Sequence, residues 1–262
     1  MNHRIVRGPN RSTELPIIAM IRVRNEQDLM KDTLDHLATF ADGIIVFDDA
    51  STDDTLSISL AHPLVIEVIV NRQWRSTDRI WEETANRRIL NQRALKRKPQ
   101  WLFYSDADER FEGDIRDYLL NECAPTVGGI RIRLLDAYIT SEDQAAFVRG
   151  QELWNFRSLF GVERRDILMA WRSSSGADFV TPDAREPRML RGEMISNFWC
   201  QHYGKSMSIA QWDETCRYYV DNFPIYRDKW AARIGKAVHV ESDFGTPLYK
   251  WDDVKSESIQ IN

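Results

Sequence analysis

The first hundred residues alternate short apolar runs, rich in β-branched side chains, with stretches of helical periodicity. The apolar runs are Ile17–Ile21, Ile44–Phe47, Val65–Val70 and Trp101–Tyr104. Strands that alternate with helices form a mostly parallel sheet, because each connecting helix packs against one face of that sheet. The pattern therefore predicts an α/β fold with a Rossmann-like sheet and helices on both faces.

The length of 262 residues suits one large domain with a small appendage. We expect a flexible arm over 1–14, a main domain over 15–205 and a helical C-terminal extension over 206–262. A helix spanning about 78–96 and a further strand at Ile130–Leu135 follow from periodicity, and Ser51 is expected to cap a short helix. Between 136 and 200 the pattern is too irregular to predict elements.

Composition excludes several classes of protein. The formal charge of −5 argues against a protein that binds nucleic acid through bulk positive charge. Three cysteines without CxxC spacing form neither a disulfide framework nor a thiolate zinc site, which favours a reducing, cytoplasmic setting. The first apolar run is too short for a membrane span, so we expect no transmembrane segment.

Acidic and polar residues follow three of the predicted strands. They form the segments Arg24–Glu26, Asp48–Asp49 and Asp106–Glu109. Open α/β sheets bind ligands at the carboxyl ends of their strands, so the three segments are expected to converge on one crevice. Each segment alone could instead cap a helix or form an Asx-turn.

Asp106 and Asp108 are separated by a single residue directly after an apolar strand. Two carboxylates at this spacing can share one hard cation, whose other ligands would be phosphate oxygens and water. Such a cation would neutralise the charge that develops on a departing diphosphate. The pair therefore indicates a metal site.

Three segments together, Ile17–Glu26, Ile44–Thr55 and Trp101–Glu109, resemble the N-terminal half of glycosyltransferase family 2. The resemblance covers about residues 15–112. It implies the GT-A fold, a nucleotide-sugar donor that is commonly UDP-linked, Mn²⁺ or Mg²⁺ on the DxD motif, and transfer with inversion. It divides the main domain into a nucleotide and metal half, 15–112, and an acceptor half, 113–205.

The resemblance also assigns substrate contacts. Arg24, Asn25 and Glu26 match the segment beside the nucleoside, and Asp49 matches a carboxylate that accepts from the uracil imide. Ala50 departs from the family pattern, which often has glycine at this position.

On the metal side, the resemblance places Asp106 against the ribose or sugar and the metal, and Asp108 directly on the metal. The segment Trp199–Gly204 is similar to a His-Tyr-Gly stretch in some members, where the histidine completes the metal site. His202 as a ligand would favour Mn²⁺ over Mg²⁺. A satisfied core histidine is the alternative.

An inverting transferase needs a base near the acceptor hydroxyl. The acids in a suitable loop are Asp183 and Glu186, in a segment framed by two prolines, and Asp136 lies further back. No sequence rule decides among them, and we favour Asp183. An ordinary surface turn, with Arg185 and Arg188 as ion-pair partners, is the alternative.

Residues 71–100 carry nine Lys or Arg against three Asp or Glu. Arg87 or Arg88 could supply a cation to the diphosphate, although most such charges are solvated. A second set could meet anionic lipid headgroups, which would give peripheral membrane contact. That set is Arg93, Lys96, Arg97 and Lys98.

The sequence thus predicts a metal-dependent glycosyltransferase that acts on a saccharide or glycolipid acceptor. Six of the nine tryptophans follow residue 150; most are expected to pack in the core, and an exposed one such as Trp154 could stack on a saccharide. Two rivals remain. A nucleotidyltransferase would be expected to carry a glycine-rich basic loop after the first strand, which is absent here, and a non-catalytic binding module would not need Asp106 and Asp108.

Overall fold

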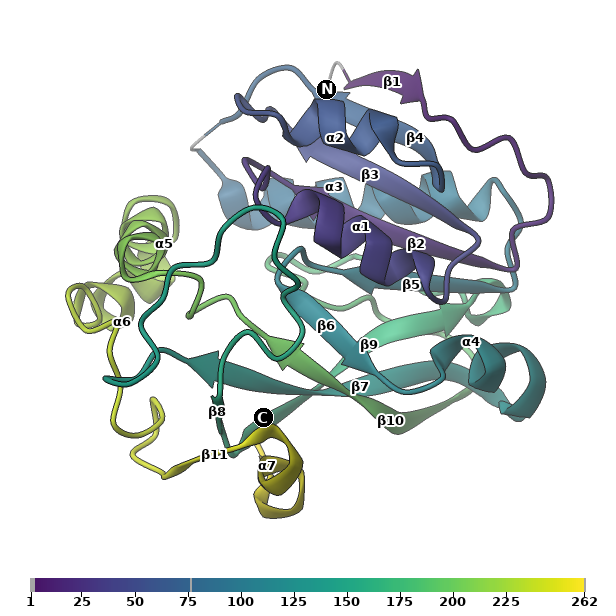
Figure 1. Cartoon of the computed structure of the whole chain (residues 1–262). Helices are drawn as coiled ribbons and strands as arrows, with labels where there is room; N and C mark the ends of the chain where they lie inside the picture. Colours follow the sequence, from purple (N-terminus) through teal and green to yellow (C-terminus); the bar gives the residue numbers. More distant parts are fainter. Residues whose placement is uncertain (1–2, 76, 262) are drawn as a thin grey trace.

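The four predicted strands of the first half lie side by side and parallel, in the order β4-β3-β2-β5 (Figure 1). The computed structural model describes residues 3–75 and 77–261. The strands are β2 (Ile17–Val23), β3 (Gly43–Asp49), β4 (Val65–Asn71) and β5 (Trp101–Ser105). The predicted α/β fold with a mostly parallel central sheet is confirmed.

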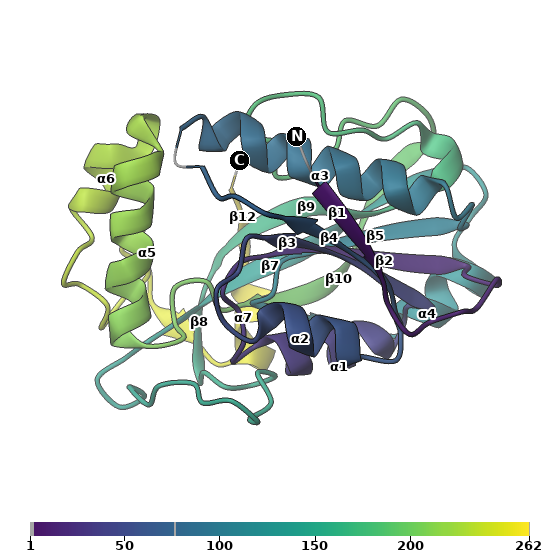
Figure 2. The same ribbon diagram turned by 90° about the horizontal axis from the view of Figure 1, so that it is seen from above.

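Helices cover both faces of this sheet (Figure 2). One face carries α1 (Met30–Ala38) and α2 (Thr55–Ala61), and the other carries α3 (Arg79–Leu95). Successive residues of a strand point to opposite faces, so β2 contributes to two separate apolar layers. Ala19 belongs to the layer that contains Leu34 of α1, and Met20 to the layer that contains Leu90 of α3.

The second half extends the same sheet. Beyond β5 the order is β9-β7-β10-β6, in which β9 runs antiparallel to β5 and to β7, and β10 runs parallel to β7. The bounds are β6 (Glu109–Glu112), β7 (Val127–Tyr138), β8 (Leu159–Gly161), β9 (Glu163–Arg172) and β10 (Glu193–His202). Periodicity located only the centre of β7 and missed β9 and β10.

The C-terminal region is mainly helical, as expected, and lies beside the sheet. It contains α5 (Ile209–Asn222), α6 (Arg227–Ala231) and α7 (Trp251–Glu257), with the two-residue strands β11 (Leu248–Tyr249) and β12 (Ile259–Gln260). A short α4 (Ile115–Asp117) precedes a π-helical turn. Figure 1 shows α5 and α6 next to the carboxyl end of β7. No helix among the described residues is long and apolar enough to cross a membrane.

Two local predictions are wrong. The arm over 1–14 contains β1 (His3–Arg7), which pairs antiparallel with β4 and so covers the edge of the sheet. Ser51 does not cap α2, because the helix begins only at Thr55, with Asp54 directly before it. The Ser51 N–H instead donates to Asp48 Oδ1 at 2.9 Å in a turn.

Tryptophan serves mostly as packing, as expected. Trp171 and Trp212 are fully buried. Trp154 is not an exposed side chain: it packs against the core, with its ring edge to Trp251 at a centroid distance of 6.1 Å.

Candidate active site

The loops after β2 and β3 are joined by hydrogen bonds at the carboxyl edge of the sheet. Asn25 Oδ1 accepts from the Thr52 N–H at 2.8 Å, and the Asn25 N–H donates to Ser51 Oγ at 3.0 Å. The Glu26 N–H donates to Thr55 Oγ1 at 2.8 Å. Two of the three predicted segments therefore form one connected surface.

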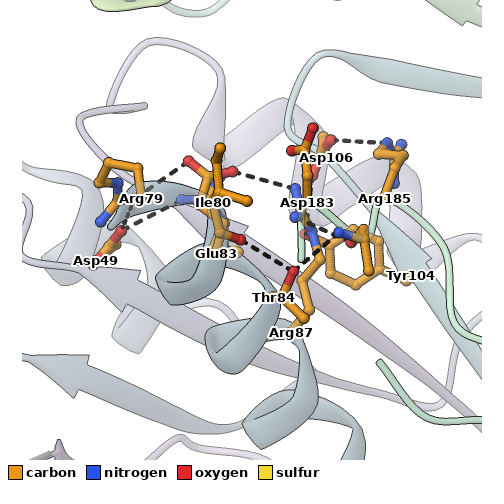
Figure 3. Close-up of polar contacts among 12 residues, drawn as sticks. Asp49, Arg79, Ile80, Glu83, Thr84, Arg87, Tyr104, Asp106, Asp183 and Arg185 are labelled. Carbon is orange, nitrogen blue, oxygen red and sulfur yellow. Dashed lines mark hydrogen bonds and ion pairs between the residues drawn. The ribbon is translucent and has the colours of Figure 1, made fainter. Parts of the chain in front are cut away.

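Asp49 lies at the end of β3 with its side chain fully buried, 0% exposed. Arg79 donates to its Oδ2 at 2.7 Å, Arg22 lies 3.4 Å from the same oxygen, and Asn71 donates to Oδ1 at 2.8 Å. Burial alone would raise the pKa of Asp49, but the charges of Arg79 and Arg22 outweigh it and hold the pKa below its usual value. Both oxygens are thus bonded within the protein, and Figure 3 shows the contact with Arg79.

Arg24 covers the same region from the β2 loop. Its Nη1 donates to the backbone oxygen of Asp49 at 3.0 Å, and its guanidinium lies over the Trp74 ring at 4.6 Å. Within residues 3–75 and 77–261, Trp74 Nε1 and Arg79 Nε are buried without a hydrogen-bond partner. The region around Asp49 therefore keeps donors that no protein group uses.

Asp106 follows β5 and is held by protein cations. Tyr104 donates to its Oδ1 at 3.0 Å, and Arg185 Nε lies 3.4 Å from its Oδ2. Burial would raise the pKa of Asp106, but the charges of Arg185, Arg87 and Arg22 outweigh it and lower the pKa to about 2. The carboxylate is therefore ionised and fixed in place.

Asp108 and His202 face each other after β5 and at the end of β10. His202 Nε2 lies 3.7 Å from Asp108 Oδ2, and the Asp108 side chain is 24% exposed. The Tyr203 N–H donates to the Asp108 backbone oxygen at 2.9 Å, which ties the two segments together. Gly204 leaves room for this approach, because a Cβ would lie 2.8 Å from Asp108 Oδ2 and 2.9 Å from His202 Nε2 and would push these side chains aside.

Negative charge crowds this part of the site. Burial, together with the charges of Asp108 and Asp106, raises the pKa of Glu26 to about 8. Burial would lower the pKa of His202, but Asp108 and Asp136 outweigh it and raise the pKa. A positive charge is therefore favoured next to Asp108.

The residues fit a divalent cation. A carboxylate and an imidazole nitrogen suit Mn²⁺ or Zn²⁺ better than Mg²⁺. No group of three or more His, Cys, Asp or Glu in the described chain forms a ready cage. A cation at Asp108 and His202 would thus need oxygens from a ligand, as the sequence argument expected.

Asp183 reaches the site on a loop that packs against α3. Its N–H donates to the Ile80 backbone oxygen at 3.1 Å, and the hydroxyl of Thr84 accepts from the Ala184 N–H at 3.0 Å (Figure 3). The hydroxyl of Tyr226 donates to Asp183 Oδ2 at 2.5 Å. Among the described residues, Oδ1 has no such partner.

Glu186 has a different place. Its Oε1 accepts from Arg131 at 2.6 Å and its Oε2 from the Leu168 N–H at 2.8 Å. Both oxygens therefore join the loop to β7 and β9. Asp183 differs in that its Oδ1 has no hydrogen-bond partner among the described residues, and the choice of base stays a prediction.

A buried charged row connects the two sides of the site, and sequence reasoning largely missed it. Arg79, Glu83 and Arg87 follow one another at intervals of four residues along α3, and Arg22 Nη2 lies 3.0 Å from Glu83 Oε2. That spacing was the available signal, since it places all three on one helix face. Arg185, considered only as a surface partner, instead contacts Asp106 and Glu109.

The two arginines that could serve a diphosphate have different surroundings. Arg87 Nε donates to the Tyr104 hydroxyl at 3.0 Å, next to Asp106, whereas Arg88 pairs with Asp178 at 2.9 Å. Arg93 and Arg97 both pair with the buried Glu67. Of the predicted lipid-facing set, Lys96, Arg97 and Lys98 are exposed and Arg93 is half-buried, and the lipid contact stays a prediction.

No family model matches the sequence. Two uncharacterized proteins, from Mycobacterium tuberculosis and Mycobacterium bovis, are 40% identical to the chain over 100 residues. The match covers 38% of this chain and 25% of each relative, so the chain matches about a quarter of their length.

Solved structures with a similar backbone trace include a mannosyltransferase from Pyrobaculum calidifontis in complex with GDP-Man and Mn²⁺. It is 18% identical, with a TM-score of 0.44 over 90% of this chain and 69% of that one. Glucosyl-3-phosphoglycerate synthase from Mycobacterium tuberculosis, solved with Mn²⁺ and UDP, is 16% identical over 50% of this chain and 46% of its own, with a TM-score of 0.28. A putative glucose-1-phosphate thymidylyltransferase from Bacillus anthracis is 11% identical over 94% of this chain and 96% of its own, with a TM-score of 0.33. The assignment of the fold of this chain therefore relies on the order and direction of its own strands.

Proposed function

We propose that the protein is a metal-dependent glycosyltransferase that moves a sugar from a nucleoside diphosphate donor, UDP-linked in our proposal, to an acceptor hydroxyl. The observation that carries this proposal is the pair formed by Asp108 and His202, 3.7 Å apart at the carboxyl edge of the sheet. The three-segment resemblance to glycosyltransferase family 2 agrees with it. A saccharide or glycolipid is the proposed acceptor class.

Asp108 and His202 would hold the cation, with Asp106 beside it facing the ribose or the sugar. When bound, the cation supplies Lewis-acid stabilisation of the departing diphosphate. Arg185, Arg87 and Arg22 surround Asp106 and add fixed positive charge to the same region. These arginines hold the carboxylate ionised before any ligand arrives.

The nucleoside would lie over the joined loops of β2 and β3, beside Arg24, Asn25 and Glu26. In the arrangement described, the Asp49 side chain is fully buried, and Arg79, Arg22 and Asn71 bind its oxygens. We therefore propose that Asp49 holds these partners in place for the nucleoside. A direct hydrogen bond to the base would require the residues that cover Asp49 to move.

Asp183 is the proposed general base. Tyr226 binds its Oδ2 and fixes the orientation of the carboxylate, which leaves Oδ1 for the acceptor hydroxyl. The acceptor oxygen would attack the anomeric carbon as its proton passes to Asp183, and the bond to the diphosphate would break. Attack from the face opposite the leaving group gives inversion.

The test is the release of nucleoside diphosphate from a panel of nucleotide sugars, with Mn²⁺ and a panel of saccharide acceptors. We expect Asp183→Asn to lower kcat about 10²–10⁴-fold without weakening nucleotide binding. Glu186→Gln is the matched control, because its carboxylate is bonded to Arg131 and Leu168. Release of pyrophosphate in a parallel assay with a nucleoside triphosphate and a sugar 1-phosphate would indicate a nucleotidyltransferase. Equal loss in both variants would remove Asp183 from its role.

A further inference from the structure

Asp136 contacts the ring nitrogen of His202 that is turned away from Asp108. The two residues are register partners on the parallel strands β7 and β10, so their side chains project from the same face of the sheet. His202 Nδ1 is 2.5 Å from Asp136 Oδ1. Strand pairing therefore presets this contact before any ligand binds.

The contact determines which ring nitrogen of His202 faces the site. A carboxylate accepts a hydrogen bond, so it favours the tautomer with the proton on Nδ1. The lone pair of the neutral ring is then on Nε2, which faces Asp108 at 3.7 Å. A histidine that binds a metal through one nitrogen commonly donates the other N–H to a carboxylate.

Asp136 is itself held in place by two cations. Arg165 pairs with Oδ1, and Lys205 Nζ lies 2.8 Å from Oδ2. Lys205 also pairs with Asp243, and Arg233 Nη2 lies 2.8 Å from the same Asp243 carboxylate. A chain of ion pairs therefore leads from Asp136, next to His202, to Asp243 and Arg233 in the C-terminal region.

These contacts argue against Asp136 as the base. Its Oδ1 is shared by His202 and Arg165, and its Oδ2 is bound by Lys205. Burial would raise the pKa of Asp136, but Arg165 and Lys205 outweigh it and lower the pKa well below its usual value. A carboxylate so strongly held as the anion is a poor proton acceptor.

We propose that Asp136 is a positioning residue that fixes the tautomer and orientation of His202 toward a divalent cation, and that Lys205 and Asp243 hold Asp136 in that position. The inference rests on the proposed function only in that a cation binds at Asp108 and His202. It assigns the C-terminal region a part in the site, through Asp243.

The test measures Mn²⁺ affinity from the electron paramagnetic resonance signal of the free ion, with and without UDP. We expect Asp136→Asn to weaken Mn²⁺ binding about 10–100-fold. In a His202→Ala background the same change should alter affinity by less than about twofold, because the two side chains act as one unit. Asp166→Asn is the matched control, since that buried carboxylate pairs with Arg164 and Ser196 away from the site.

A second measurement does not need the metal. Nitrogen-15 spectra of histidine-labelled, metal-free protein at alkaline pH should show His202 protonated on Nδ1, with the signal assigned by its loss in His202→Ala. In Asp136→Asn the two tautomers should mix, and Asp243→Asn should give a smaller change of the same kind. This signature distinguishes positioning from a general loss of folding.

The outcomes separate the inference from the proposed function. Absence of Mn²⁺ binding to the unchanged protein, with and without UDP, would overturn both. Normal Mn²⁺ binding that Asp136→Asn leaves unchanged would overturn the inference alone. Equal effects of Asp136→Asn with and without His202 would also overturn it.

Discussion

Asp49 and Asp108 both follow a buried strand at the same edge of the sheet, yet their surroundings differ. Asp49 is fully buried, and Arg79, Arg22 and Asn71 occupy its oxygens. Asp108 is partly exposed, and its side-chain contact across the site is with His202. An acid after a strand can therefore either brace the site or face a ligand, and the supply of nearby cations decides which.

The largest expected difference between Asp49 and Asp108 is in how much their replacement lowers the stability of the fold. Asp49→Ala leaves the buried guanidinium of Arg79 without its closest carboxylate, so we expect a loss of about 3–5 kcal/mol in the free energy of unfolding. Asp108→Ala removes a partly exposed carboxylate and should cost less than about 1 kcal/mol. Urea denaturation measures both. Similar losses in the two variants would mean that the comparison is wrong.

Glu26 extends the comparison to pH, because it lies on the nucleoside side but feels the charge of Asp108 and Asp106. Its pKa is about 8 in the folded protein against an ordinary 4.5, so the folded state keeps a proton that the unfolded chain loses. Stability should therefore fall as pH rises through this window.

Glu26→Gln cannot ionise and should lack this fall. We expect the variant to gain up to about 4 kcal/mol over the unchanged protein between pH 5 and pH 9, at about 1.4 kcal/mol per pH unit, measured by urea denaturation. Parallel stability profiles for the two proteins would show that Glu26 is not perturbed by the acids of the metal side.

The smallest expected effect concerns Ala50, which follows Asp49 in a left-handed conformation with φ of 59°. Glycine adopts this conformation without strain, so Ala50→Gly should stabilise the protein by about 0.5 kcal/mol. Ala85→Gly, inside α3, should instead destabilise it by about 1 kcal/mol. Thermal unfolding compares the two, and a loss in Ala50→Gly would contradict the strain argument.

The first half of the fold could be predicted because the strands β2 to β5 are largely buried, and a helix follows each of β2, β3 and β4. The continuous apolar runs of β2 and β3 show this directly. The second half could not, because partly exposed strands such as β10 carry mixed side chains and pair with residues far along the chain. β1 was missed because it is short, polar and half exposed.

The site divides in the same way. The motif segments indicated Asp106, Asp108 and His202, and the structure brings Asp108 and His202 together. Sequence could not indicate that Arg185 reaches Asp106 or that Asp136 supports His202, because both contacts depend on strand and loop pairing between distant segments. The identity of the base remains a prediction.

The most direct test of the account is calorimetric titration of UDP into the protein, with Mn²⁺ and with EDTA, repeated on Asp108→Ala. We expect binding that requires both the cation and Asp108, because the carboxylate and His202 need a diphosphate to complete the coordination of the cation. Binding that is equal with EDTA, or unchanged in Asp108→Ala, would contradict the metal site. No binding of UDP, GDP, CMP or dTDP under any condition would contradict the nucleotide site and favour a non-catalytic module.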